Sequence, residues 1–212
     1  MITVTFHYPN GQPYLHHEAK KAKKQAASAT TIFGKRGMSL EEELNESNQY
    51  YLAKEIAVVH KKPTPIQIVK VDYPQRSQAV IKEAYFKRPS TTDYNGVYHG
   101  HYIDFDAKET KSKTSFPLHN FHEHQVKHMD ECLKQGGICF ALIRFVVLDR
   151  IFVYPASNLI TFWRAQMTGG RKSIPLDAVV ADGVEINYQL NPLIPYLDGV
   201  DELIARTQQG GN

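Results

Sequence analysis

The sequence predicts a mixed α/β fold in which helices flank a central mixed sheet. Two strand-like runs supply the centre of the sheet: residues 102–108, where apolar and polar side chains alternate, and the apolar run 138–148. Stretches with helical spacing of apolar residues lie around these runs, with proline and glycine at the breaks. A length of 212 residues is enough for one such domain with appendages.

The domain is expected to begin with a helix after Ser39. Ser39 and Glu42 have the spacing of a capping box, in which each side chain accepts a hydrogen bond from the other residue's backbone. An apolar stripe follows at helical spacing, made of Leu40, Leu44, Tyr51 and Leu52. Pro63-Thr64-Pro65 then breaks the chain before a strand at 66–71.

The later elements follow from similar signals. They are a helix over about 118–134, ended by Gly136-Gly137, and a strand pair at 138–148 and 151–154. Three helices come next: one from Pro155 to near 166, a short one after Pro175, and a last one over about 194–206.

Two segments outside this core are expected to be unstructured. Residues 1–36 form a flexible basic arm, because the stretch from His16 to Arg36 carries six lysines and arginines against a single acid, Glu18. Such an arm can order on a polyanion, and a merely solvated tail is the alternative. The core domain then spans 37–206, and residues 207–212 form a disordered tail.

Residues 72–90 are expected to project from the core as an inserted stalk. Cations alternate there with aromatic residues: Arg76, Lys82, Lys87 and Arg88 with Tyr73, Tyr85 and Phe86. Cations can contact phosphates while aromatic rings stack on exposed bases, so the segment suits a DNA-probing projection. The alternative is an ordinary hairpin whose aromatic residues pack on the core.

Asp93, Asp106 and Lys108 form the candidate catalytic set. Asp106 and Lys108 are two apart on a predicted strand and point to the same face, and a hairpin through Asn95-Gly96 can bring Asp93 alongside them. Two carboxylates and an ammonium can hold Mg²⁺ and hydrolyse a phosphodiester. This layout resembles the PD-(D/E)xK nuclease core, with Thr92 in place of the usual proline.

Other interpretations of these residues stay open. Lys108 can be an ordinary surface partner of Asp104 and Asp106, worth about 0–1 kcal/mol. His124 and His128 share a helix face, but no HExxH order or cysteine partner accompanies them, so the sequence disfavours zinc there. Gln125, which lies between them, can reach a metal or its waters.

Composition excludes several classes of protein. The formal net charge is only +3, and no apolar run approaches the roughly 20 residues that span a bilayer. No secretory signal opens the chain, and Cys132 and Cys139 are expected to be free thiols in a reducing cytoplasm. A GxxxxGK[ST] loop is absent, which argues against ATP hydrolysis.

Four segments resemble the RecU-type Holliday junction resolvases: GMSLEEELN at 37–45, STTDYNGV at 90–97, YIDFDAKET at 102–110 and FHEHQ at 121–125. The resemblance covers nearly the whole chain. It implies a cytoplasmic, nucleoid-associated endonuclease that depends on Mg²⁺, with Mn²⁺ as a substitute. Such an enzyme resolves four-way DNA junctions by paired symmetric nicks in recombination and repair.

The resemblance also assigns roles by position. It implies Thr91, Asp93, Asp106 and Gln125 as the magnesium set and Lys108 as the transition-state stabiliser. Glu41 is a weaker candidate for an accessory acid. The implied DNA contacts are Arg36, Arg76, Tyr85, Phe86, Lys87 and Arg88. Asp106 stands where the family often has glutamate, and its shorter side chain can alter metal geometry or preference.

A homodimer with twofold symmetry would match the two symmetric strands that are cut in a junction. A recombinase and a branch-migration helicase are the candidate protein partners that the resemblance suggests. Two rival functions remain: a general PD-(D/E)xK nuclease acting on ordinary duplex, and a non-catalytic protein that binds branched DNA.

Overall fold

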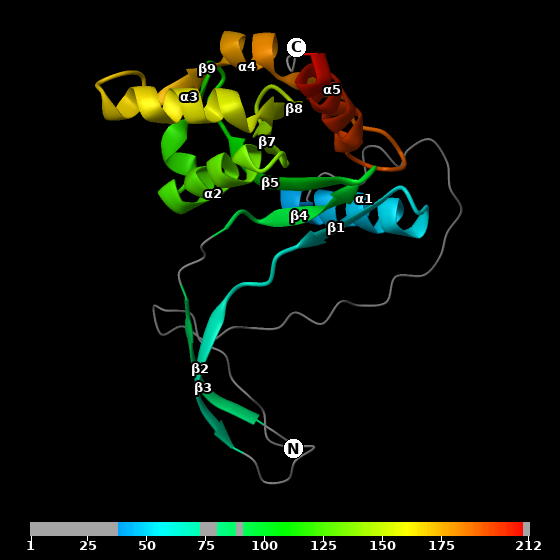
Figure 1. Cartoon of the computed structure of the whole chain (residues 1–212), viewed down its shortest axis with the longest axis vertical. Helices are drawn as coiled ribbons and strands as arrows, with labels where there is room; N and C mark the ends of the chain where they lie inside the picture. The colour runs from blue at the N-terminus through cyan, green and yellow to red at the C-terminus, as the bar shows by residue number, and fades with distance from the viewer. Residues whose placement is uncertain (1–37, 73–79, 88–90, 210–212) are drawn as a thin grey trace. The chain divides into compact units, whose positions relative to one another are not determined.

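A six-stranded mixed sheet forms the centre of the molecule (Figure 1). The computed structural model describes residues 38–72, 80–87 and 91–209. The strands lie in the order β1 (Ala57–Lys61), β4 (Tyr94–Tyr98), β5 (His101–Thr110), β7 (Ile138–Phe145), β8 (Arg150–Pro155) and β10 (Val184–Ile186). Only β5 and β7 pair in parallel, and the other neighbours are antiparallel. This arrangement confirms the predicted fold class.

Each face of the sheet is covered by its own apolar cluster. Helices α1 (Leu40–Ala53) and α5 (Tyr196–Gln209) pack on one face, and α2 (Glu123–Lys134), α3 (Ala156–Met167) and α4 (Leu176–Asp182) pack on the other. Strand β7 serves both faces: Ile138, Phe140 and Leu142 enter the first cluster, while Cys139, Ala141 and Ile143 enter the second. Burial on both sides explains why this strand is apolar except at Arg144.

Helix α1 begins as the sequence predicts. The Ser39 N–H donates to the Glu42 carboxylate (2.8 Å), and the Glu42 N–H donates to Ser39 Oγ (3.3 Å), so the capping box is present. Smaller elements complete the fold: the 3₁₀ helix η2 (Leu118–Asn120) and the short strand pair β6 (Ser115–Pro117) and β9 (Ser173–Pro175).

The strand predicted at 66–71 exists but does not join the core sheet. As β2 (Ile66–Asp72) it pairs only with β3 (Val80–Phe86), in a separate two-stranded sheet. Almost every residue of both strands is exposed, so neither contributes apolar side chains to the core. The inserted segment therefore begins at Ile66 rather than at residue 72. The edge of the six-stranded sheet is instead occupied by β1, a strand that the sequence did not predict.

The hairpin predicted through Asn95-Gly96 is wrong. Both residues lie inside β4 and face β1, and the turn falls at His99 and Gly100, whose φ angles are 47° and 80°. Gly96 is required for a different reason: a Cβ there would overlap the carbonyl oxygen of Val58. The Asn-Gly pair is typical of tight hairpins, but here the glycine permits close approach of two strands.

Two helix boundaries also differ from the predictions. The helix expected from 118 splits into η2 and then α2, which starts at Glu123. The last helix continues to Gln209, so residues 207–209 are helical, where a disordered tail was expected. Within the described residues, no helix combines the length and the apolar character that crossing a membrane requires.

We expect Gly96→Ala to destabilise the protein, because the new methyl group must push β1 away from β4. Forcing extra volume into a packed site costs about 1–3 kcal/mol. Urea unfolding should show this loss, whereas Val97→Ala, at an exposed neighbouring position, should unfold near the wild-type midpoint. Equal midpoints for Gly96→Ala and wild type would contradict the close-approach role.

Candidate active site

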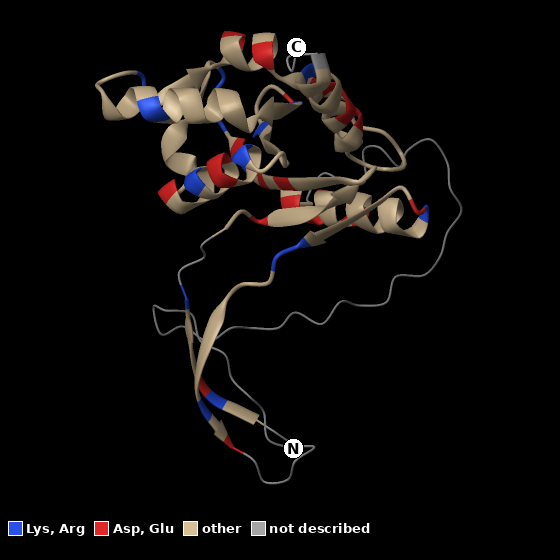
Figure 2. Cartoon of the chain, viewed as in Figure 1, with Lys and Arg blue, Asp and Glu red and all other residues tan. Residues whose placement is uncertain are grey.

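Strand β5 carries two carboxylates into the interior. Ile103 and Phe105 enter the apolar cluster beneath α1 and α5, while Asp104 and Asp106 point to the opposite face and are completely buried. Figure 2 shows acidic residues on the strands of the central sheet. The sequence predicted the alternation correctly, but it did not predict that both acids lose all contact with solvent.

The three predicted catalytic residues meet at this face. Because β4 pairs antiparallel with β5, the residue before β4, Asp93, lies close to Asp106. The Asp93 N–H donates to Asp106 Oδ1 (2.9 Å). Lys108 Nζ donates to Asp93 Oδ2 (2.8 Å) and lies 3.8 Å from Asp106 Oδ1. The ammonium therefore lies between the two carboxylates.

Helix α2 supplies a further group of the predicted set. Gln125 is buried in its first turn, and its Nε2 donates to Asp106 Oδ1 (3.0 Å). Its Oε1 accepts the His122 N–H (3.0 Å) and so caps the helix. In this arrangement the Gln125 side-chain N–H, rather than its oxygen, faces Asp106.

The other two predicted site residues lie further out. Thr91 belongs to the same turn as Asp93, and its hydroxyl donates to the Thr92 carbonyl (3.3 Å). Glu41, on α1, is half-exposed and pairs with Lys61 at the end of β1. Within the described residues, Glu41 forms an ion pair with Lys61 and with no residue of the predicted site.

One oxygen of Asp106 has no hydrogen-bond partner among the described residues. Oδ2 is buried and accepts no hydrogen bond from any described residue. Burial raises the pKa of Asp106 to about 7; Lys108 lowers it, and the charge of Asp93 raises it. A free buried carboxylate oxygen beside a second carboxylate suits a hard divalent cation, which prefers oxygen ligands. The residues present therefore fit such an ion.

Asp104 has the opposite surroundings. Its Oδ2 accepts hydrogen bonds from Lys62 Nζ (2.7 Å) and the Tyr102 hydroxyl (2.7 Å) and lies 3.2 Å from His128 Nε2. The Thr92 hydroxyl donates to its Oδ1. The sequence did not identify Lys62 as part of the site. The available signal was a lysine directly before Pro63, where the chain enters the inserted segment.

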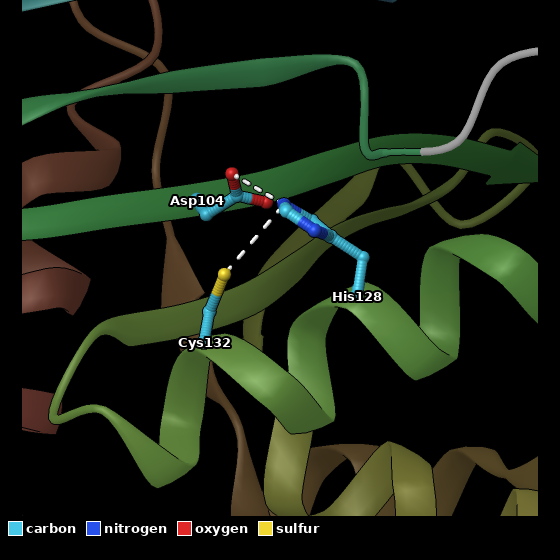
Figure 3. A group of neighbouring side chains, drawn as sticks. All are labelled: Asp104, His128 and Cys132. Carbon is cyan, nitrogen blue, oxygen red and sulfur yellow. Dashed lines mark hydrogen bonds and ion pairs between the residues drawn. The ribbon is translucent and has the colours of Figure 1, made fainter.

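Cys132 lies beside the Asp104 carboxylate. Cys132 Sγ is 3.6 Å from His128 Nε2, and both residues approach Asp104 from α2 (Figure 3). The expectation that no cysteine accompanies the histidines is wrong, because Cys132 follows His128 by one helical turn. His124 does not join this pair and instead stacks on His122. The three ligand-type atoms lie within 4.8 Å of one another. The Lys62 ammonium, however, already neutralises this carboxylate.

The proposed DNA-contact residues are described only in part. Tyr85 and Phe86 on β3 are 59% and 63% exposed, and Lys87 is also exposed. For these two aromatic residues, the alternative of packing on the core is therefore wrong, whereas Tyr73 lies outside the described residues. Arg36, Arg76 and Arg88 lie outside the described residues. Both cysteines are free thiols, as the sequence predicts.

Stability without metal should depend on the charge of Asp106. Its pKa of about 7 in the folded protein exceeds the unfolded value, so its contribution to stability is lost as pH rises through about 7. Asp106→Asn mimics the protonated form. In EDTA near pH 8.5, it should be more stable than wild type by about 1–3 kcal/mol, and near pH 5, where Asp106 is protonated in the folded protein but still mostly ionised in the unfolded chain, the difference should be smaller. Urea unfolding at both pH values measures this, and a less stable variant at the higher pH would contradict it.

Comparisons with known proteins show the family to which this chain belongs. A family model described as Recombination protein U matches residues 35–202. A relative from Latilactobacillus sakei subsp. sakei (strain 23K), named Holliday junction resolvase RecU, is 69% identical over 98% of this chain and 100% of its own length. A relative with the same name from Limosilactobacillus reuteri (strain DSM 20016) is 62% identical over 95% of this chain and 98% of its own length. Another, from Lacticaseibacillus casei (strain BL23), is 64% identical over 95% of this chain and 96% of its own length. The chain belongs to the RecU family of recombination proteins.

Proposed function

We propose that this protein is a Holliday junction resolvase, a Mg²⁺-dependent endonuclease that cuts four-way DNA junctions by paired symmetric nicks. One observation carries the proposal beyond family membership. Asp93, Asp106 and Lys108 converge, and a buried oxygen of Asp106 has no hydrogen-bond partner in the part of the chain that the structure describes. Membership of a family whose relatives are named resolvases implies a divalent metal, and the oxygen ligands favour Mg²⁺, with Mn²⁺ as a substitute.

Asp93 and Asp106 would hold the metal. Thr91 and Gln125 complete the predicted set, and Gln125 would have to turn its amide oxygen from the His122 N–H toward the metal to act as a ligand. When bound, Mg²⁺ supplies a Lewis acid beside the scissile phosphodiester. Lys108 projects its ammonium between the carboxylates, where it can donate to a phosphate oxygen and stabilise the negative charge that develops during attack by water. The Gln125 amide and the Asp93 N–H fix Asp106 by donating to its other oxygen.

The β2–β3 hairpin supports recognition of branched DNA. It carries both signs of charge (Figure 2), and Tyr85 and Phe86 expose rings that can stack on unpaired bases. With Lys87 and the predicted contacts Arg36, Arg76 and Arg88, these rings would bind a junction through its shape and phosphates. The basic arm, residues 1–36, would add further phosphate contacts outside the nuclease domain.

The assembly and setting belong to the same proposal. A twofold homodimer would place one site at each of the two symmetric strands. A recombinase and a branch-migration helicase remain candidate partners, and the expected location is the cytoplasm, at the nucleoid.

Cleavage should require both the metal and the acids. With a labelled four-way junction and a matched linear duplex, wild type should nick only the junction, symmetrically, and only when Mg²⁺ is present. Asp93→Asn and Lys108→Met should each lower the cleavage rate about 100-fold or more, because each removes a group that acts at the reacting phosphate. Junction binding in EDTA should persist in both variants.

The rival functions give different results in this assay. Equal cleavage of junction and duplex would indicate a general nuclease. Tight junction binding without cleavage under any metal condition would indicate a non-catalytic DNA-binding protein. Either result would overturn the proposal.

Phe86→Ala should weaken junction binding with little effect on folding, because the ring is exposed. One base–aromatic stack is worth about 1–3 kcal/mol, so the Kd should rise about 5- to 150-fold. Leu190→Ala removes another exposed apolar side chain, far along the sequence from the hairpin, and serves as the control. An unchanged Kd for Phe86→Ala in a gel-shift titration would contradict the stacking role.

A further inference from the structure

We propose that Lys62 is a positioning residue that holds the Asp93 turn against β5 and so sets the metal affinity of the site. The inference rests on the proposed function, because it takes Asp93 and Asp106 as the metal-binding acids. Lys62 follows β1 directly and precedes Pro63.

Lys62 contacts the turn through both its backbone and its side chain. Its N–H donates to the Asp93 carbonyl (2.8 Å). Its Nζ donates to Thr92 Oγ1 (2.8 Å) and to Asp104 Oδ2 (2.7 Å). Thr92 also donates to Asp104 Oδ1. One residue thus connects the end of β1, two consecutive residues of the turn, and the buried carboxylate of β5.

Burial makes these contacts stronger than those of an ordinary surface lysine. The Lys62 side chain is 18% exposed, and that of Asp104 is fully buried. Ion pairs and hydrogen bonds at such a site are little screened by solvent, and removing one partner leaves a buried charge without compensation. Lys61, the preceding residue, points outward to Glu41 instead, as the alternation of strand side chains requires.

The geometry separates positioning from catalysis. Among the described residues, Lys62 Nζ bonds to Thr92 and Asp104, whereas Lys108 Nζ is the ammonium beside Asp93 and Asp106. Lys62 therefore acts through the turn. Without its side chain, Thr92 loses a donor, and the Asp93 carboxylate is no longer held at one position relative to Asp106.

The test compares metal binding, DNA binding and stability in Lys62→Met. We expect the protein's affinity for Mn²⁺, measured by the electron paramagnetic resonance of free Mn²⁺, to fall about 10-fold or more, which is the order of loss seen when a residue that supports a metal site from outside its ligand set is removed. The Mg²⁺ concentration for half-maximal cleavage should rise by a similar factor. Junction affinity in EDTA should stay at the wild-type value. Lys134→Met, which removes an exposed lysine of α2, should match wild type in every measurement.

A second variant separates positioning from general destabilisation. Lys62→Met combined with Asp104→Asn removes both charges of the buried pair, so the midpoint of urea unfolding should recover. Mn²⁺ affinity should stay low, because methionine cannot donate to Thr92. Recovery of Mn²⁺ affinity together with stability would overturn the positioning role.

Asp93→Asn distinguishes failure of this inference from failure of the proposed function. If Asp93→Asn binds Mn²⁺ as wild type does, the proposed metal set is wrong and the inference falls with it. If Asp93→Asn loses Mn²⁺ while Lys62→Met binds it normally, only the role of Lys62 is overturned.

Discussion

The structure depends on the burial of two carboxylates on one face of β5. A buried carboxylate without a partner is unfavourable, so the surrounding elements must compensate Asp104 and Asp106. The compensation differs between them. Asp104 is matched inside the protein by Lys62, Tyr102 and the Thr92 hydroxyl, whereas Asp106 keeps one oxygen without a described partner. Two residues with the same orientation on one strand thus have different surroundings: Asp104 connects several elements, and Asp106 has the free oxygen that the proposed metal would use.

The opposite face of β5 makes this arrangement rigid. Phe105 stacks between Tyr94 and Phe140, at centroid distances of 4.9 and 4.6 Å, so the strand is held by aromatic packing on the side away from the acids. Parallel pairing with β7 over eight residue pairs fixes its register. A strand fixed in this way presents Asp106 and Lys108 at constant positions, which catalysis at a phosphodiester requires.

The site and the β2–β3 hairpin, whose contact with DNA is a proposal, are built from different kinds of structure. The acids lie on a strand buried among packed elements, whereas Tyr85 and Phe86 lie on a two-stranded sheet whose residues are mostly exposed. Exposed rings would be unfavourable in a protein without a partner for them. Their exposure is consistent with a ligand such as a DNA junction, which offers unpaired bases and phosphates.

Strand and helix periodicity determined the local features from the sequence alone. The capping box at Ser39, the shared face of Asp106 and Lys108, and the apolar strand β7 all follow from residues close together in the chain. Only the tertiary structure decided which elements meet. The predicted Asn95-Gly96 turn proved to be part of a strand because β1 packs against it, and Lys62 reaches Asp104 across 42 residues of sequence. Neither contact leaves a local pattern, since each depends on a pairing between segments that the chain brings together only on folding.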